Sequence, residues 1–124
     1  MFQIKNTTRK NNPSLPFQKI KEYILGKNYE LSLVFIGDQL SRKLNKKYRN
    51  KNKIANILSF PLDKNSGEIF INLGQAQKGC TKFGRSYKNF VGLLLIHGLL
   101  HLKGYQHSSK MDKEEEKIQK KFGV

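Results

Sequence analysis

The chain has 124 residues, with 24 Lys+Arg against 9 Asp+Glu and a formal net charge of +15. This length fits a single domain, 1–124, with one modest core, and excludes a second domain. The longest strongly apolar run, Phe90–Ile96, is far shorter than the ~20 residues of a membrane-spanning helix, so a membrane span is excluded.

The charge and the cysteine content indicate the partners and the compartment. The like charges of so basic a surface repel one another unless a polyanion binds to it. RNA, DNA and anionic membranes are the candidate partners. A composition rich in Lys and Asn throughout is an alternative explanation for part of the excess. The lone Cys80 cannot form an intramolecular disulfide, and no signal-peptide pattern is visible, so we expect a cytoplasmic protein.

The first half of the chain alternates strands and helices. Residue periodicity predicts a short strand over 2–5, a helix over 17–25, and a strand over 31–36 that is buried on both faces and central in a sheet. We expect a further helix over 39–48, with Asp38 as its N-cap. Its inward stripe would be Leu40, Leu44 and Tyr48.

The middle of the chain reads as a hairpin. A strand over 54–60 that ends at Pro61 and a strand over 67–72 could pair antiparallel. The segment 73–82 has a weaker pattern, with one or two helical turns, and Cys80 in it is expected to be a core residue.

Two helices are predicted after residue 86. Over 87–102 the residues are apolar on nearly every face, which is typical of a buried helix, and Ser86 is its candidate cap. A serine-capped, solvent-facing helix follows over 111–118. Its inward residues would be Met111, Ile118 and Phe122.

All three histidines lie in one short stretch. His97 and His101 are four apart, so on a helix both imidazoles project from one face. Gly104 can take the left-handed conformation that ends a helix, which would let His107 approach the same point. The pattern predicts a three-nitrogen metal site at the end of the buried helix.

A metal is the preferred interpretation, because neighbouring Leu and Ile side chains offer the imidazoles no hydrogen-bond partner; core histidines are the alternative. Nitrogen ligands at this spacing fit one Zn²⁺ per chain best, although nickel, copper or iron also accept imidazole. Three protein ligands leave a position for water or substrate, which favours a hydrolase.

The spacing is also similar to that of the metzincin proteases, in which a glutamate follows the first histidine and acts as general base. Here that position is Gly98, and no other acid lies in the motif. A metallopeptidase is therefore only an alternative.

A basic run precedes the predicted hairpin. From Arg42 to Lys53 there are seven Lys or Arg and no acidic residue. A solvated helix face is the common explanation of such a run, and contact with a nucleic acid is the other.

Three blocks of the sequence resemble the bacterial YbeY endoribonucleases, the rRNA maturation factor family. The run 97–107 is similar to the family signature His-Gly-x-Leu-His-Leu-x-Gly-Tyr-Asp-His. Residues 48–61 resemble the block Tyr-Arg-x-Lys-Asp-x-Pro-Thr-Asn-Val-Leu-Ser-Phe-Pro, and 67–69 resemble Gly-Asp-Ile. Met111 and Glu115 also match the family tail, so the resemblance runs from about Glu30 to Gly123.

The resemblance implies a compact α+β fold, with a small mixed sheet of about four strands packed with helices. It implies one zinc held by His97, His101 and His107, and metal-dependent cleavage of single-stranded RNA in 16S rRNA maturation and ribosome quality control. Arg49 matches an arginine of the basic cleft, where it would act in catalysis. The RNA backbone would be followed by Lys46, Lys47, Lys51 and Lys53.

The chain departs from the family pattern at several positions, of which Gln106, in place of aspartate, lies in the signature itself. A possible role for Gln106 is to orient a ligand, since an amide keeps a hydrogen bond but cannot act as a base. Other departures that matter are Ile54, Ala55 and Glu68. A ribosome- or RNA-binding module with a structural metal is therefore a second hypothesis.

Overall fold

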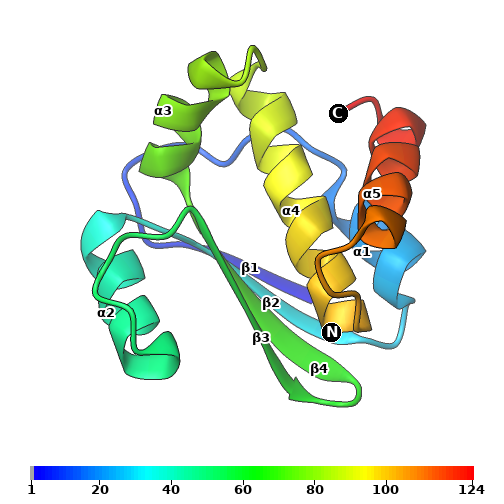
Figure 1. The fold of residues 1–124 in the computed structure, drawn as a ribbon, viewed down its shortest axis with the longest axis horizontal. Helices are drawn as coiled ribbons and strands as arrows, with labels where there is room; N and C mark the ends of the chain where they lie inside the picture. Colours follow the sequence, from blue (N-terminus) through cyan, green and yellow to red (C-terminus); the bar gives the residue numbers. More distant parts are fainter. Residues whose placement is uncertain (1) are drawn as a thin grey trace.

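The computed structural model describes residues 2–124, and within that range the chain forms four strands and five helices (Figure 1). The strands are β1 (Phe2–Asn6), β2 (Glu30–Ile36), β3 (Ile57–Asp63) and β4 (Ser66–Asn72). The helices are α1 (Phe17–Leu25), α2 (Asp38–Arg49), α3 (Leu73–Lys82), α4 (Tyr87–Lys103) and α5 (Ser109–Phe122).

The strands form one mixed sheet in the order β1-β2-β4-β3. β1, β2 and β4 are parallel, whereas β3 is antiparallel to β4. This arrangement confirms the expected α+β class, the central place of the strand over 31–36 and the antiparallel hairpin.

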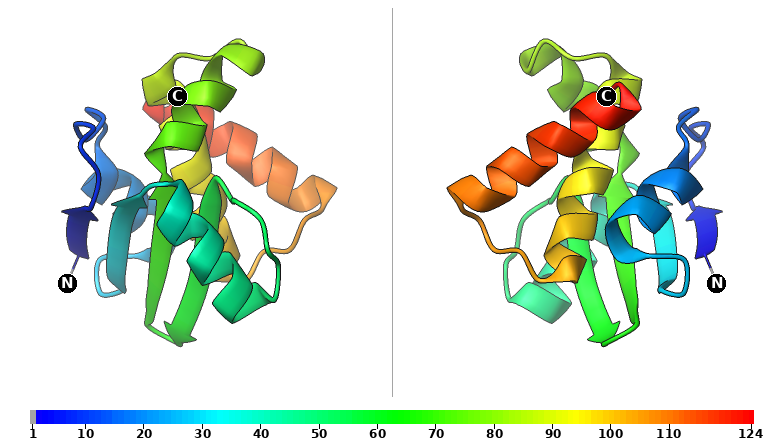
Figure 2. Two further views of the ribbon diagram at one scale, coloured as in Figure 1. Left: turned by 90° about the vertical axis from the view of Figure 1, so that its left-hand side faces the viewer. Right: turned by 90° about the vertical axis from the view of Figure 1, so that its right-hand side faces the viewer.

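The helices lie on both faces of the sheet. α4 crosses one face with α1 and α5 beside it, and α2 lies on the opposite face (Figure 2). The core lies between α4 and the sheet, where alternate residues of β2 and β4 point towards the helix. Its fully buried members include Leu33, Phe35, Ile69, Ile71, Leu95 and Leu99.

The prediction that β2 is buried on both faces is wrong in part. Leu31, Leu33 and Phe35 are buried beneath α4, but Ser32 and Val34 on the other face are only half-buried. The reason is that α2 covers only part of that face.

The buried stripe of α2 also differs from the prediction. Gly37 is the N-cap and Asp38 is the first helical residue, whose carboxylate accepts hydrogen bonds from the side chains of Asn72 and Gln75. The buried residues are Ser41 and Asn45, whereas the expected inward residue Tyr48 is 59% exposed. α2 is held by polar contacts to the following loop, which apolar periodicity does not report.

Two segments of the middle of the chain differ from the prediction, β3 by a shift of three residues and α3 by its length. β3 begins at Ile57 and continues past Pro61 to Asp63, with a register shift there. Proline is tolerated because β3 is an edge strand. α3 is a full helix of 10 residues, in which Cys80 is buried as expected.

The two C-terminal helices confirm the predicted caps. The hydroxyl of Ser86 accepts a hydrogen bond from the N–H of Asn89, and that of Ser108 accepts one from the N–H of Met111. Met111 and Ile118 are buried on the inward face of α5. None of the helices in residues 2–124 has the length and apolar character that a membrane span requires.

Candidate metal centre

The three histidines converge at the C-terminal end of α4. His97 and His101 lie on consecutive turns of the helix, which ends at Gly104 with a left-handed φ of +110°. The chain turns back there and brings the exposed His107 over the other two imidazoles. One candidate ligand atom from each histidine lies within 4.8 Å of the others.

Hydrogen bonds hold two of the three imidazoles by their Nδ1 atoms. Nδ1 of His97 is 3.3 Å from a carboxylate oxygen of Glu115 on α5, and Nδ1 of His101 is 3.0 Å from the carbonyl oxygen of Tyr105. Both partners accept, so both Nδ1 atoms carry the proton. Such partners orient metal-binding histidines and raise their basicity.

The remaining nitrogens of these two residues face each other. With Nδ1 protonated, each neutral imidazole presents a lone pair at Nε2, and the Nε2 atoms of His97 and His101 are only 3.1 Å apart. Two lone pairs at that distance repel unless a cation lies between them. The separation is below about 4.2 Å, twice a Zn–N bond, so the pair fits one metal ion, and the exposed His107 can adjust to complete the set.

Burial also prepares His101 for a metal. Desolvation lowers the pKa of His101 below its ordinary value of 6.5, and the hydrogen bond to Tyr105 opposes this shift, whereas His97, His107 and Arg49 add to it. A lower pKa keeps the imidazole neutral at pH 7, and only the neutral form binds a metal.

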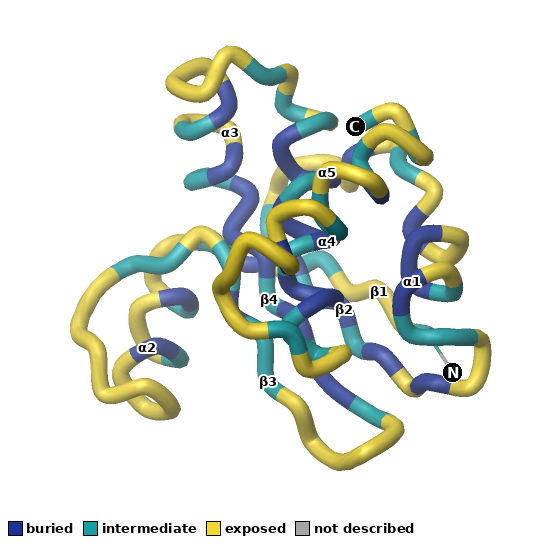
Figure 3. The backbone as a smooth tube through the Cα atoms, turned by 45° about the vertical axis from the view of Figure 1, so that its right-hand side comes forward, coloured by how far each residue is buried: buried dark blue, intermediate teal, exposed yellow. Residues whose placement is uncertain are grey.

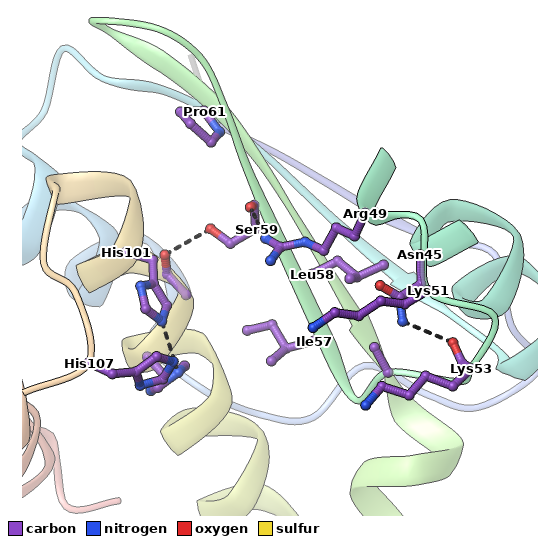
Figure 4. A pocket seen from close by; sticks show the side chains of 13 residues that line it. Asn45, Arg49, Lys51, Lys53, Ile57, Leu58, Ser59, Pro61, His101 and His107 are labelled. Carbon is purple, nitrogen blue, oxygen red and sulfur yellow. Dashed lines mark hydrogen bonds between the residues drawn. The ribbon is translucent and has the colours of Figure 1, made fainter. Parts of the chain in front are cut away.

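The histidines form one wall of a cavity of about 470 Å³, and cationic side chains form the opposite wall (Figure 4). Arg49, Lys51 and Lys53 line this cavity together with the three histidines. Lys46 and Lys47 do not line it; they are exposed on α2, and the Lys47 ammonium lies over the ring of Tyr48. The basic run is therefore divided between the cavity and the solvent.

Arg49 is tethered at the edge of the cavity. Its Nη2 donates a hydrogen bond of 3.0 Å to the carbonyl oxygen of Ser59, and its guanidinium lies 5.4 Å from the ring centroid of Phe60. The Ser59 hydroxyl in turn donates to the carbonyl oxygen of Gly98 at 3.0 Å. β3 thus connects the arginine to the histidine helix.

The loop after α2 is exposed (Figure 3) but anchored by the two buried residues of that helix. Ser41 bonds to both the carbonyl oxygen and the N–H of Ala55, and Asn45 donates to the carbonyl oxygen of Lys53. These contacts fix the path of the loop that carries Lys51 and Lys53.

Sequence reasoning did not assign a role to Glu115 or Ser59. Glu115 lies four residues after Met111 and three before Ile118, so the inward face of its helix was the available signal. Ser59 carried none, since its partner is a helix carbonyl. Gln106 is exposed, and its side chain makes no hydrogen bond within residues 2–124.

Gly98 lets the helix approach the sheet closely. A Cβ at this position would lie 2.8 Å from Cδ1 of Ile57 and 3.2 Å from Cδ1 of Ile69. The glutamate of the metzincin pattern therefore has no room there unless the side chains of Ile57 and Ile69 move.

Fold and site together define an α+β protein with a candidate three-histidine metal centre and a cationic cavity. The family model described as Endoribonuclease YbeY matches residues 3–123. The chain belongs to the Endoribonuclease YbeY family.

Curated relatives and a solved structure agree with this assignment. Endoribonuclease YbeY of Nautilia profundicola is 38% identical over 109 residues, which cover 82% of this chain and 78% of the relative. Endoribonuclease YbeY of Helicobacter pylori is 34% identical over 121 residues, which cover 94% of this chain and 86% of the relative. The solution structure of a Thermotoga maritima protein superposes with a TM-score of 0.72 at 21% identity, covering 99% of this chain and 90% of the other, and supports the fold.

Proposed function

We propose that residues 1–124 act as one metal-dependent endoribonuclease that cuts single-stranded RNA. The observation that carries this proposal is the single cavity shared by three histidines and by Arg49, Lys51 and Lys53. A metal on one wall and cations on the other suit a phosphodiester, which needs a Lewis acid and neutralisation of its negative charge. The names of the relatives support the same activity.

The metal would be held by His97, His101 and His107, and Zn²⁺ is the ion we propose because imidazole nitrogens suit it. When bound, it would supply Lewis-acid chemistry at a phosphoryl oxygen or a water molecule. Glu115 and the carbonyl of Tyr105 keep two of the imidazoles in the tautomer that this requires.

Arg49 would be the catalytic residue of the opposite wall. Its guanidinium can neutralise charge that develops on the phosphate as the bond breaks, and the hydrogen bond to Ser59 holds it ready. Lys51 and Lys53 would bind the neighbouring phosphates, and the exposed Lys46 and Lys47 more distant ones. Gln106 could add a hydrogen bond from an amide, but it cannot act as a general base.

The fluorogenic cleavage of a single-stranded RNA tests this proposal. Metal-loaded protein should cut the RNA, and His101→Ala should lose both metal and activity. Arg49→Ala should slow cleavage about 10²-fold while metal content is unchanged, and the matched control Arg42→Ala, exposed on the same helix, should not. If wild type and His101→Ala cleave the RNA at equal rates, the proposal of a metal-dependent endoribonuclease is wrong.

The proposal also includes the identity of the metal and of the biological substrate. Elemental analysis of protein purified without added metal should give one zinc per chain. We propose 16S rRNA and the small ribosomal subunit as the cytoplasmic partners, since a charge of +15 favours a large polyanion. Co-sedimentation with ribosomal subunits tests that association.

An RNA- or ribosome-binding module with a structural metal is the second candidate. It is favoured by the exposed Gln106 and by a cavity whose lining residues, within 2–124, include no carboxylate. It predicts salt-sensitive RNA binding that His107→Ala leaves unchanged, with no turnover by the wild type. A metallopeptidase has no such support, because Gly98 leaves no room for its glutamate.

A further inference from the structure

A second cavity lies directly beside the candidate metal centre. Its volume is about 430 Å³, and it shares His97 and Ile57 with the first cavity. Its other apolar lining residues are Phe83 and, on α4, Phe90, Leu93 and Leu94, and its polar ones are Asn56, Arg85 and Glu115. Phe90, Leu94, His97 and His101 recur at spacings of three or four, so they share one face of α4 and join the two cavities into one groove.

An aromatic pair forms the far end of this groove. The rings of Phe83 and Phe90 are stacked, with centroids 5.5 Å apart and an interplanar angle of 16°. Phe90 is buried at 4% exposure, whereas Phe83 is 63% exposed. One face of Phe83 is therefore occupied by Phe90, and the exposed area of the ring must lie largely on its other face.

Of the three polar residues that line the second cavity but not the first, Arg85 and Asn56 suit a nucleotide, and the carboxylate of Glu115 is engaged with Nδ1 of His97 at 3.3 Å. The guanidinium of Arg85 makes one hydrogen bond, of 3.3 Å, to the side chain of Gln119, which leaves further N–H groups for a phosphate. Asn56 is exposed and lines the groove, and its amide can both donate to and accept from a base edge.

We propose that this second cavity, the Phe83 groove, is a nucleobase subsite. A base of the single-stranded RNA stacks on the exposed face of Phe83 and extends the Phe83–Phe90 stack, while a phosphate of the same strand reaches the histidines. This inference rests on the proposed function. Continuity through His97 with the adjoining cavity, which is lined by Arg49, Lys51 and Lys53, favours a nucleic acid over an apolar peptide. Aromatic stacking is the common way to hold an unpaired base.

Substitutions at Phe83 in the full-length, metal-loaded protein test the subsite. Phe83→Leu keeps an apolar cover on Phe90 but removes the ring, and it should raise the KM for single-stranded RNA roughly 10-fold, the effect of losing one stacked base, with little change in kcat. Phe83→Tyr keeps the ring and should restore the wild-type KM. Tyr23→Leu, at an exposed aromatic residue on α1, is the matched control and should leave KM unchanged.

A modified RNA identifies the stacking contact itself. Abasic sites are introduced one at a time along the oligonucleotide. At one position the abasic RNA should raise the wild-type KM by the same factor as Phe83→Leu, and it should add nothing further in that variant. The fluorescence of 2-aminopurine at that position should be quenched by wild type and not by Phe83→Leu.

Two results would overturn the subsite, and they are distinguishable. If wild type cuts RNA but Phe83→Leu has the same KM and every abasic site acts equally in both proteins, the subsite is wrong and the endoribonuclease stands. If wild type neither cuts nor binds single-stranded RNA, the proposed function fails and the subsite with it.

Discussion

Single residues of the candidate metal centre are positioned by partners from other elements. His97 belongs to α4, but the carboxylate that orients its ring comes from Glu115 on α5, where the side chain is only 14% exposed. His101 depends instead on a backbone carbonyl, that of Tyr105. Of the two orienting groups, only that of Glu115 can be removed by substitution without touching a ligand.

Glu115→Ala should weaken metal binding by about 10- to 100-fold, because the imidazole of His97 loses the acceptor that fixes its tautomer. Competition of the protein with a fluorescent chelator measures the affinity. Glu116→Ala is the matched control, since that exposed residue pairs with Lys120 away from the site. If both variants bind metal as wild type does, Glu115 has no role in the centre.

Gly98→Ala should lower the free energy of unfolding by about 1–3 kcal/mol, since the added methyl group overpacks the contact with Ile57 and Ile69. Thermal or urea denaturation of the metal-free protein measures the loss. Gly74→Ala is the control, because Gly74 also lies within a helix, α3, and a Cβ there would have its nearest atom at an ordinary 3.5 Å. Equal stability of the two variants would contradict the close packing of α4 on the sheet.

At the level of elements, the end of α4 and the loop after α2 each present part of the site. The left-handed Gly104 reverses the chain so that His107 meets the helix, and α2 fixes the cationic loop by means of buried polar side chains. Gly104 and Ser41 each position a stretch of backbone that carries site residues. Substituting either should therefore affect the site, although neither lies in contact with a bound ligand.

Gly104→Ala should cost roughly 1–2 kcal/mol of stability, because alanine is strained at this φ, and it should also weaken metal binding as His107 moves. Gly123→Ala is a matched control: Gly123 caps α5 in the same left-handed region, at φ +70°. That variant should lose comparable stability and bind metal normally. Normal metal affinity in Gly104→Ala would show that the turn does not position His107.

Ser41→Ala should destabilise the protein by about 1–3 kcal/mol, because the carbonyl oxygen and the N–H of Ala55 lose their buried partner. The loop that carries Lys51 and Lys53 should move, so the KM for RNA should rise while metal content is unchanged. Gln39→Ala, exposed on the same helix, should change neither quantity. If Ser41→Ala lowers stability but leaves the KM for RNA unchanged, the anchoring of this loop has no role in RNA binding.

At the level of the whole molecule, charge and metal chemistry meet in one cavity. The excess of cations covers much of the surface, but Arg49, Lys51 and Lys53 face the histidines across a few residues of β3. In the proposed function, a general attraction for polyanions would be combined with a local site for a phosphodiester.

RNA affinity should fall as the salt concentration rises. In a plot of the logarithm of the binding constant against the logarithm of the salt concentration, each phosphate contact contributes a slope of about −0.7, so Arg49, Lys51 and Lys53 together contribute about −2. The double variant Lys51→Ala/Lys53→Ala should reduce the magnitude of the slope by about 1.4. Lys120→Ala/Lys121→Ala, on the exposed side of α5, is the control with the same loss of charge. Equal slopes for the two double variants would place RNA outside the cavity.

The sequence by itself determined the main strands and helices, the serine and glycine caps and the histidine cluster, because each is a local pattern, whereas the α+β class was implied by the resemblance to a family. Helical periodicity and the spacing of His97, His101 and His107 depend only on residues close in the chain. Local patterns also led to two wrong predictions. Tyr48 is exposed because α2 buries the polar side chains of Ser41 and Asn45 instead, and the strand continues past Pro61 because β3 lies at the edge of the sheet.

Only the tertiary structure decided which residues from distant segments meet at the site. Glu115 reaches His97 because α5 packs on α4, and Arg49, Lys51 and Lys53 face the histidines because β3 brings the loop after α2 beside the histidine helix. The stack of Phe83 on Phe90 likewise depends on how α3 meets α4. Such contacts join residues of different elements, and no periodicity within one element encodes them.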